Sequence, residues 1–192
     1  MFRIWLDFET GGLDAKTCGL TQLAFLTVDE QGEVLDMGNF DIKPFEGSEV
    51  SPTALKVTNK TYDEVMGYED EGIVLQLFLE ILEKHINKMS RDENFTVGAY
   101  NGQFDVQFLA AWMERHNKKF FNYFNYHVND PLALVRVLRW EGKVNIPSLK
   151  LSEVYKALFN EEFDAHDALA DILATKRVHD RLVKDYLCLG TS

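Results

Sequence analysis

The chain begins with three β-prone segments separated by turn-forming residues. Apolar residues dominate 2–8 and 20–28, and the polar turn at 29–32 leads into a third segment at about 34–42. Short apolar runs bounded by Gly and Asp are typical of strands. Because these three segments follow one another with only short connections, they predict an antiparallel meander.

Signals for helices follow the meander. Ser51 and Pro52 offer an N-cap with proline at the first helical position, and 61–64 has the form of a capping box, so two short helices are predicted. A longer helix of about four turns is predicted over 73–86, and we expect it to pack on the sheet. Two apolar rows at helical spacing carry this prediction: Ile73, Leu77, Ile81 and His85, and beside them Val74, Phe78, Leu82 and Ile86.

The second half of the chain predicts two more strands and four helices. One strand is expected at 95–100, before the turn Asn101-Gly102, and another ends at Asp130. The helices are expected from 103 through 113, then over 132–138, 149–159 and 168–187. Strands early and helices late predict an α/β three-layer domain, with ligands at the carboxyl ends of strands. Without an internal repeat or linker, 1–192 is expected to form a single domain.

The composition fits a globular protein in a reducing compartment. With 192 residues, 46% of them hydrophobic, the chain can bury one contiguous core. No apolar run reaches the roughly 18 to 20 residues of a membrane span, and Asp7 interrupts the first apolar run, so a cytoplasmic protein without a membrane partner is expected. The two cysteines, Cys18 and Cys188, lack metal-ligand spacing and are too few for a disulfide framework.

The net charge alone argues against a nucleic-acid partner. Twenty basic against thirty-one acidic residues give a formal charge of −11, and this is the wrong sign for attracting phosphates. The argument weakens if several carboxylates hold divalent metal ions, because bound ions reverse the local sign.

The acids of the first predicted strand are candidates for such a site. Asp7 and Glu9 lie two residues apart, so their side chains emerge on the same face. Alone, an Asp-x-Glu pair is more often a solvated strand end. The turn over 10–14 contains two glycines, however, and its backbone can approach a ligand and offer N–H groups to a phosphate.

Two further acidic positions come later in the chain. Asp105 falls at the opening of a predicted helix, where the helix dipole favours a carboxylate. This role does not exclude metal ligation, because both place a carboxylate at the carboxyl end of a strand. His166 and Asp171 are five residues apart, a rotation of about 140° on a helix, so they converge only if His166 lies before the helix proper. An N-cap at Asp164 would permit that arrangement.

These motifs together resemble a known family. Asp-x-Glu at 7–9, Asn-x-x-Phe-Asp at 101–105 and His-x-x-x-x-Asp at 166–171 occur in the order and spacing of the DEDD-type exonucleases with histidine, the family of the DNA polymerase III proofreading subunit. The resemblance runs from about residue 3 to residue 177. It includes the segments 51–58, 130–134 and 148–151.

The resemblance implies a ribonuclease H-like fold, two Mg²⁺ or Mn²⁺ ions and removal of nucleotides from 3′ ends. Asp7 would bridge both ions, Glu9 and Asp171 would hold the ion that activates water, and Asp105 would complete the other. His166 would be the general base.

The resemblance also implies substrate contacts and partners. The positions that typically hold the terminal nucleotide are Thr10, Gly11, Leu13, Asn101 and Phe104. Single-stranded DNA 3′ ends are the favoured substrate, with nucleoside 5′-monophosphates as products in proofreading or repair, and a DNA polymerase is a candidate partner. Tyr100 stands where many relatives have histidine, and Thr58 where proofreading subunits often have one, so placement within a subfamily is open.

The chemistry of phosphodiester hydrolysis requires the same kinds of groups. Phosphodiester hydrolysis needs an activated water and relief of charge on the leaving oxygen, which two divalent ions supply. Four carboxylates suit such hard cations, and an imidazole can accept a proton at neutral pH. The one basic stretch is equally compatible with guiding phosphates and with a solvated helix face. It comprises Arg136, Arg139, Lys143 and Lys150.

Three other functions compete with this hypothesis. An RNA 3′–5′ exonuclease, similar to ribonuclease T or oligoribonuclease, would differ in recognising the 2′-hydroxyl. An HD-type phosphohydrolase, suggested by the His166-Asp167 pair, would need an all-helical scaffold and leave Asp7 and Glu9 unexplained. A non-catalytic nucleic-acid-binding module would be expected to have lost a ligand, whereas all five residues are present.

Overall fold

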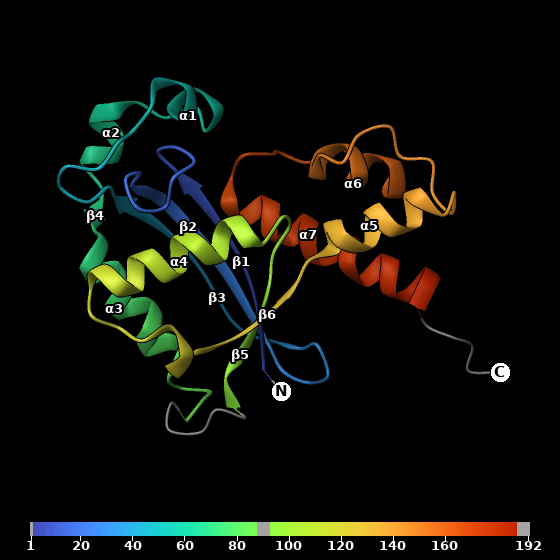
Figure 1. Ribbon diagram of the computed structural model, residues 1–192, viewed down its shortest axis with the longest axis horizontal. Coiled ribbons are helices and arrows are strands. Elements are labelled where there is room, and N and C mark those ends of the chain that lie inside the picture. Colours follow the sequence, from blue (N-terminus) through green and yellow to red (C-terminus); the bar gives the residue numbers. More distant parts are fainter. Residues whose placement is uncertain (1, 88–92, 188–192) are drawn as a thin grey trace.

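A six-stranded mixed sheet forms the centre of the computed structural model, which describes residues 2–87 and 93–187 (Figure 1). The strands lie in the order β4 (Glu69–Asp70), β3 (Val34–Lys43), β2 (Leu20–Val28), β1 (Arg3–Thr10), β5 (Phe95–Gly98) and β6 (Phe124–Asn129). Strands β1 to β3 pair antiparallel, as the sequence predicts, and β5 and β6 run parallel to β1. Strand β4 was not predicted, because its two residues are too few for a periodic pattern.

The helices lie close to their predicted positions. They are α1 (Pro52–Val57), α2 (Tyr62–Met66), α3 (Glu71–Leu82), α4 (Gln103–Arg115), α5 (Pro131–Trp140), α6 (Leu151–Phe159) and α7 (Ala168–Leu182), with a 3₁₀ turn at Phe120–Asn122. Both predicted caps are present. The Ser51 hydroxyl accepts the Ala54 N–H, and Thr61 and Glu64 form a reciprocal capping box.

The long predicted helix packs through a narrower face than its apolar pattern suggests. In α3 the row through Val74, Phe78 and Leu82 is buried, whereas Ile73 and Leu77 of the neighbouring row are exposed. The helix packs on the sheet as predicted, but only the second row faces it, because residues 75 and 79 complete the buried face on its other side. The helix also ends at Leu82, so the predicted extension to 86 does not form.

Helix α7 begins at Ala168 as predicted, but its N-cap and its end differ from expectation. Its N-cap is Asp167, which accepts the Ala170 N–H, and not Asp164. Both residues suit an N-cap, so local preference could not choose between them. The α-helix ends at Leu182 and continues as a π-helical turn over Val183–Leu187. Cys188 lies outside the described residues, and Cys18 is a buried free thiol.

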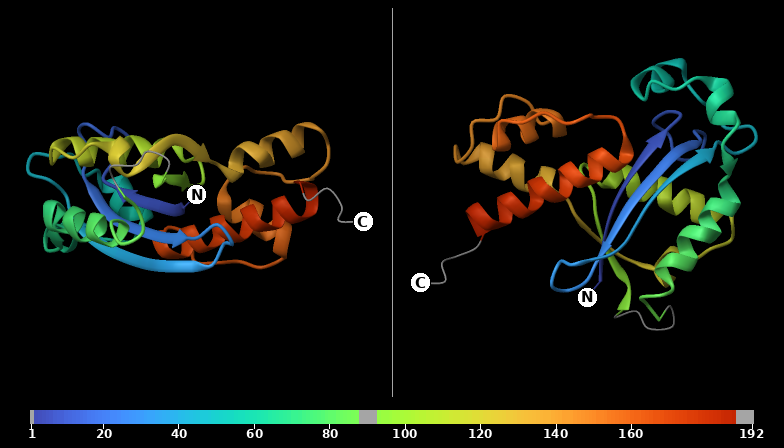
Figure 2. Two further views of the ribbon diagram at one scale, coloured as in Figure 1. Left: turned by 90° about the horizontal axis from the view of Figure 1, so that it is seen from below. Right: turned by 180° about the vertical axis from the view of Figure 1, so that it is seen from behind.

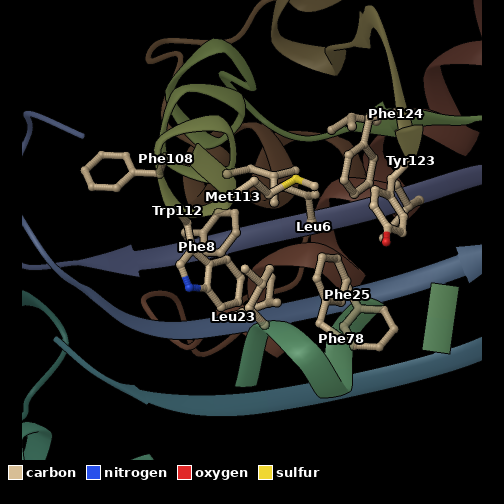
Figure 3. Packing of buried hydrophobic residues seen from close by; sticks show 14 of the residues in the cluster. Leu6, Phe8, Leu23, Phe25, Phe78, Phe108, Trp112, Met113, Tyr123 and Phe124 are labelled. Atoms are coloured by element: carbon tan, nitrogen blue, oxygen red, sulfur yellow. The ribbon is translucent and has the colours of Figure 1, made fainter. Parts of the chain in front are cut away.

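The principal core lies between one face of the sheet and helices α3 and α4. Phe8 of β1 packs edge-on against Trp112, and the ring of Phe78 lies nearly parallel to the same indole. Figure 3 shows these rings among the buried side chains of the core. The opposite face of the sheet is covered by α7, where Trp5 lies in a cluster with Ile172. Since side chains alternate along a strand, burial of Phe8 directs Asp7 and Glu9 to the α7 side.

A second cluster joins α5, α6 and α7, and Figures 1 and 2 show these three helices gathered at one side of the molecule. Helices thus cover both faces of a mixed sheet, which confirms the predicted α/β three-layer architecture. In the part of the chain that the structure describes, no helix is both long and apolar enough to cross a membrane.

Candidate active site

The predicted acids gather where three parallel strands end. Strands β1, β5 and β6 run in the same direction, so their carboxyl ends meet at one edge of the sheet. Asp7 and Glu9 lie near the end of β1, and Asp105 follows β5 in the first turn of α4. Asp171 approaches from the first turn of α7, which crosses the β1 face that carries the first two acids.

Asp105 is fixed by the backbone of the neighbouring strand. Strand β5 pairs with β1 only as far as Trp5, so the Phe8 N–H further along that edge needs another acceptor. The Asp105 carboxylate accepts it at 3.1 Å. Asp105 is buried, with 3% of its surface exposed. The same residue, Phe8, therefore orients the two strand acids and holds the helix acid.

His166 reaches Asp171 because it lies before the helix, as the sequence analysis required. Its backbone has φ 74°, while the other described non-glycine residues with positive φ are all asparagines. A left-handed conformation is costly for histidine and often marks a functional position. The turn places the His166 N–H on the Asp171 carboxylate at 2.9 Å, and leaves the imidazole exposed.

Burial, with repulsion from nearby carboxylates, raises the pKa of all four acids. Burial, followed by repulsion from other carboxylates, raises the pKa of Glu9 to about 8 and holds the pKa of Asp7 well above its usual range. Burial also raises the pKa of Asp105 to about 8, against the opposing effect of the Phe8 hydrogen bond. Asp171 rises less, to a pKa of about 6, because the His166 N–H and imidazole stabilise its ionised form.

This donor set fits divalent cations. Glu9, His166 and Asp171 each offer one ligand atom, and the three atoms lie within 4.8 Å of one another. The strongest charges acting on Asp7 are those of carboxylates, Asp105 first among them. Oxygen-rich, mutually repelling groups of this kind are what Mg²⁺ and Mn²⁺ bind. A bound cation would convert the repulsion into attraction.

Two cavities flank the acid cluster. The larger, of about 650 Å³, lies on the α5 and α6 side and is lined in part by His166 and Asp171. The smaller, of about 440 Å³, lies on the α1 side, and Glu9 is in its wall. An extended ligand that passes over the acids would therefore occupy both cavities.

The predicted nucleotide contacts divide between these cavities. Thr10, Leu13 and Phe104 line the smaller one, and Leu13 is 86% exposed. Asn101 lines the larger one. Gly11 is buried outside both linings, where a Cβ atom would come within 2.5 Å of the Glu49 carbonyl.

Gly11 is therefore needed for close packing of the turn against the segment before α1, since its carbonyl also accepts the Ser51 N–H. Its predicted role in holding the nucleotide remains a prediction. The adjacent Gly12 lines the cavity instead.

Three residues near the site were missed as contributors. Asp130 accepts the N–H of Asn101 and so fixes a left-handed turn at φ 60°. Asp167 adds negative charge beside Glu9. Tyr100 donates its hydroxyl to the Leu149 carbonyl at 2.7 Å. The sequence signals were that Asp130 and Asp167 lie within quoted motifs and that Tyr100 precedes one, but the contacts themselves depend on tertiary structure.

Acids and a histidine at the carboxyl edge of a mixed sheet covered by helices on both faces suit the hydrolysis of phosphodiesters with divalent metal ions. A family model described as the RNase_T exonuclease family matches residues 4–179. The chain belongs to this family. It is a hydrolytic nuclease, a 3′–5′ exonuclease acting on nucleic acid, and divalent metal ions are expected because the family is metal-dependent.

Individual relatives agree with the family. The chain is similar to ribonuclease T of Actinobacillus pleuropneumoniae, at 27% identity over 190 residues that cover 96% of this chain and 84% of the relative. It is also similar to ribonuclease T of Histophilus somni, at 30% identity over 119 residues that cover 59% of this chain and 54% of the relative. The chain thus spans about half of the second relative.

The fold is shared with E. coli exonuclease I, solved in complex with a dT13 oligonucleotide. The TM-score is 0.77 at 24% identity, and the match covers 96% of this chain but only 41% of exonuclease I. The likeness is therefore one of fold, to part of a larger protein. It confirms the predicted ribonuclease H-like architecture.

Proposed function

We propose that this chain removes nucleotides one at a time from the 3′ ends of single-stranded nucleic acid, releasing nucleoside 5′-monophosphates. The observation that carries the proposal is the convergence of Glu9, His166 and Asp171 between two cavities. A site open on both sides would accept a strand, and the smaller cavity would accept its last nucleotide.

The proposed ligands are the four predicted carboxylates. Asp7, Glu9, Asp105 and Asp171 would hold two Mg²⁺ or Mn²⁺ ions, which supply an activated water and relieve charge on the leaving oxygen when bound. His166 is exposed beside Glu9 and Asp171, so its imidazole is placed to take the proton of the attacking water. The His166 main chain meanwhile orients Asp171 through its N–H.

The lining of the smaller cavity supports hydrolysis at the 3′ end of a nucleic-acid strand. Leu13 presents an exposed apolar side chain at its mouth and Phe104 forms part of its wall, so a terminal base can pack between them. The Thr10 hydroxyl lies in the same wall, bonded to the Gly12 carbonyl. This arrangement would place the 3′-hydroxyl near Glu9 and the scissile phosphate over the acids.

The larger cavity supports binding of the strand that follows. Arg136 and Lys150 line it together with His166. Within the described residues neither basic side chain has a carboxylate within ion-pair distance, so both are available for phosphates. Two of the four residues of the predicted basic stretch thus face the site, and Arg139 and Lys143 lie outside this lining.

Two kinds of nucleic acid are candidate substrates, DNA and RNA. Single-stranded DNA is the substrate expected from the motifs. RNA is the second candidate, because the curated relatives with the greatest coverage are named ribonuclease T. A DNA polymerase partner and a cytoplasmic location also stay predictions, testable by co-purification and by fractionation of the source cells.

The decisive experiment uses purified protein with Mg²⁺ on matched DNA and RNA strands. A 5′ label should give a descending ladder, and a 3′ label should appear at once as mononucleotide. A 3′-phosphate should block degradation, because it adds negative charge beside Glu9, whereas a 5′-phosphate should have little effect. Rapid cleavage of a circular single strand, or indifference to a 3′-phosphate, would contradict the proposal.

A further inference from the structure

Helix α5 carries an exposed tryptophan that neither the core nor the acid cluster uses. Trp140, the last residue of the helix, is 88% exposed, whereas the other two tryptophans, Trp5 and Trp112, are 3% and 0% exposed. Full exposure of so large an apolar ring costs hydrophobic free energy. Such a ring is commonly part of a binding surface.

Trp140 lies on the helix row that forms a wall of the larger cavity. Leu132 and Arg136 line that cavity, and Trp140 follows them at the same spacing of four residues. Residues four apart are neighbours on one helix face, about 6 Å along the axis. The row therefore leads from the acid cluster, through Arg136, to the indole.

The surroundings of Trp140 suit a polyanion. Exposed basic residues lie around it in an otherwise acidic protein, with Glu141 as the nearby acid. They are Arg136, Arg139 and Lys143. Exposed Val137 widens the apolar patch. Basic groups interleaved with an aromatic ring are the features by which proteins hold single strands.

The end of the helix holds this patch in place. Gly142 adopts φ 64°, its N–H binds the Arg139 carbonyl, and the Lys143 N–H binds the Leu138 carbonyl. This pair of bonds is a Schellman motif, which ends a helix in a fixed geometry. The backbone beneath Trp140 is thus ordered, and a base that stacks there meets a preformed surface.

We propose that the row Arg136–Trp140 is an upstream subsite for the same single strand, in which Trp140 stacks on a base several nucleotides from the 3′ end. The inference rests on the proposed function. It adds that strands long enough to reach α5 bind more tightly than strands that fill only the two cavities.

Intrinsic fluorescence provides a direct test, because Trp140 is the exposed one of three tryptophans. Full-length protein with the substitution Asp7→Asn, which prevents degradation, is titrated with oligothymidylates of about 3 and about 15 nucleotides, lengths that bracket common single-strand site sizes. We expect the longer strand to quench the fluorescence and to protect it from acrylamide, and the shorter strand to do neither. Quenching that persists in Asp7→Asn/Trp140→Phe would overturn the assignment.

Kinetics on the active protein provides the second test. Trp140→Ala should raise KM for the longer strand by about fivefold or more, the effect of losing one base–aromatic stack, and leave the shorter strand unchanged. Trp140→Phe should keep most of the wild-type KM. Phe121→Ala is the matched control, because Phe121 is an exposed aromatic residue just before β6, at the opposite end of that strand from the site.

The outcomes separate the inference from the proposed function. If wild-type protein degrades neither these DNA strands nor RNA strands of the same lengths from their 3′ ends, the proposed function fails. If it degrades both lengths and Trp140→Ala changes neither KM, the subsite is wrong. If Trp140→Ala leaves both KM values unchanged but alters the sedimentation of the protein, the patch is a protein interface and the proposal is overturned.

Discussion

Asp105 has two roles at once, as a hydrogen-bond acceptor for the Phe8 N–H and as a proposed metal ligand, and two substitutions separate them. Asp105→Asn keeps an oxygen for the buried N–H but removes the charge. We expect it to lose nuclease activity and to melt no lower than wild type without metal, because it removes a buried carboxylate whose pKa is raised.

Asp105→Ala is the matched comparison. It leaves the Phe8 N–H without an acceptor, which costs about 1 to 3 kcal/mol, so it should be inactive and less stable. Thermal unfolding and a gel assay measure both properties. If Asp105→Asn retained wild-type activity with Mg²⁺, Asp105 would be a structural residue only.

Substitution can also distinguish a general-base role of His166 from a role as a metal ligand. His166→Ala should lower kcat by about 10²- to 10⁴-fold, the usual contribution of a general base, while Mg²⁺ binding measured by calorimetry changes little. Imidazole added to the buffer should restore part of the lost rate, because it can take the proton in the space that the side chain leaves. The same additive should not rescue Asp171→Asn.

A failure of imidazole to rescue His166→Ala, together with a loss of Mg²⁺ binding, would make His166 a metal ligand. This alternative has a structural basis, because a ring nitrogen of His166 lies within 4.8 Å of a carboxylate oxygen of Glu9 and of one of Asp171.

At the scale of elements, the site depends on how the segment between α5 and α6 is held. Tyr100, just after β5, donates its hydroxyl to the Leu149 carbonyl, and Lys150 follows in the wall of the larger cavity. Tyr100→Phe removes one half-buried hydrogen bond, worth about 0.5 to 1.5 kcal/mol. We expect KM to rise several-fold with kcat nearly unchanged, because the acids are not moved.

Tyr123→Phe is the control for this prediction. It removes a comparable hydroxyl, which donates to Glu83 at 2.6 Å from the start of β6, far along the strand from the site. Its stability should fall by at least as much, because the lost bond is to a carboxylate, while KM stays at the wild-type value. Equal KM for both variants and wild type would show that the Tyr100 contact does not position the cavity wall.

These elements also show how far the sequence could lead. Alternation around Phe8 was enough to place Asp7 and Glu9 on one face, because it depends only on strand geometry. The N-cap of α7 was not predictable, since Asp164 and Asp167 have the same local preference and the turn at His166 decides between them.

Contacts between distant segments were also beyond the sequence. Tyr100 and Leu149 are 49 residues apart, and their hydrogen bond exists only once α5 and α6 have packed on α7. The division of the predicted nucleotide contacts into two cavities has the same origin, because it depends on where α1 and α5 lie relative to β1. Motif spacing contains no information on either.

For the whole molecule, the acid cluster lowers stability when metal is absent, and the sign of the pH dependence follows from the pKa shifts. In the folded protein the pKa is about 8 for Glu9 and for Asp105 and about 6 for Asp171, all above the ordinary values near 4. Between about pH 4 and pH 8 the folded state therefore binds more protons than the unfolded state. Stability must fall as pH rises through this window.

We therefore expect the melting temperature of metal-free protein in EDTA to decrease from pH 5 to pH 8, and this decrease to shrink in Asp7→Asn, which removes one of the repelling charges. Saturating Mg²⁺ should raise the wild-type melting temperature most at pH 8, because within this range the ligands are most ionised there and repel one another most strongly when metal is absent. Glu80→Gln, a substitution at an exposed position of α3 whose hydrogen-bond partner is the uncharged Gln76, should leave the slope unchanged. A melting temperature of metal-free wild type that rises with pH over this window would mean that the four carboxylates do not share one buried site.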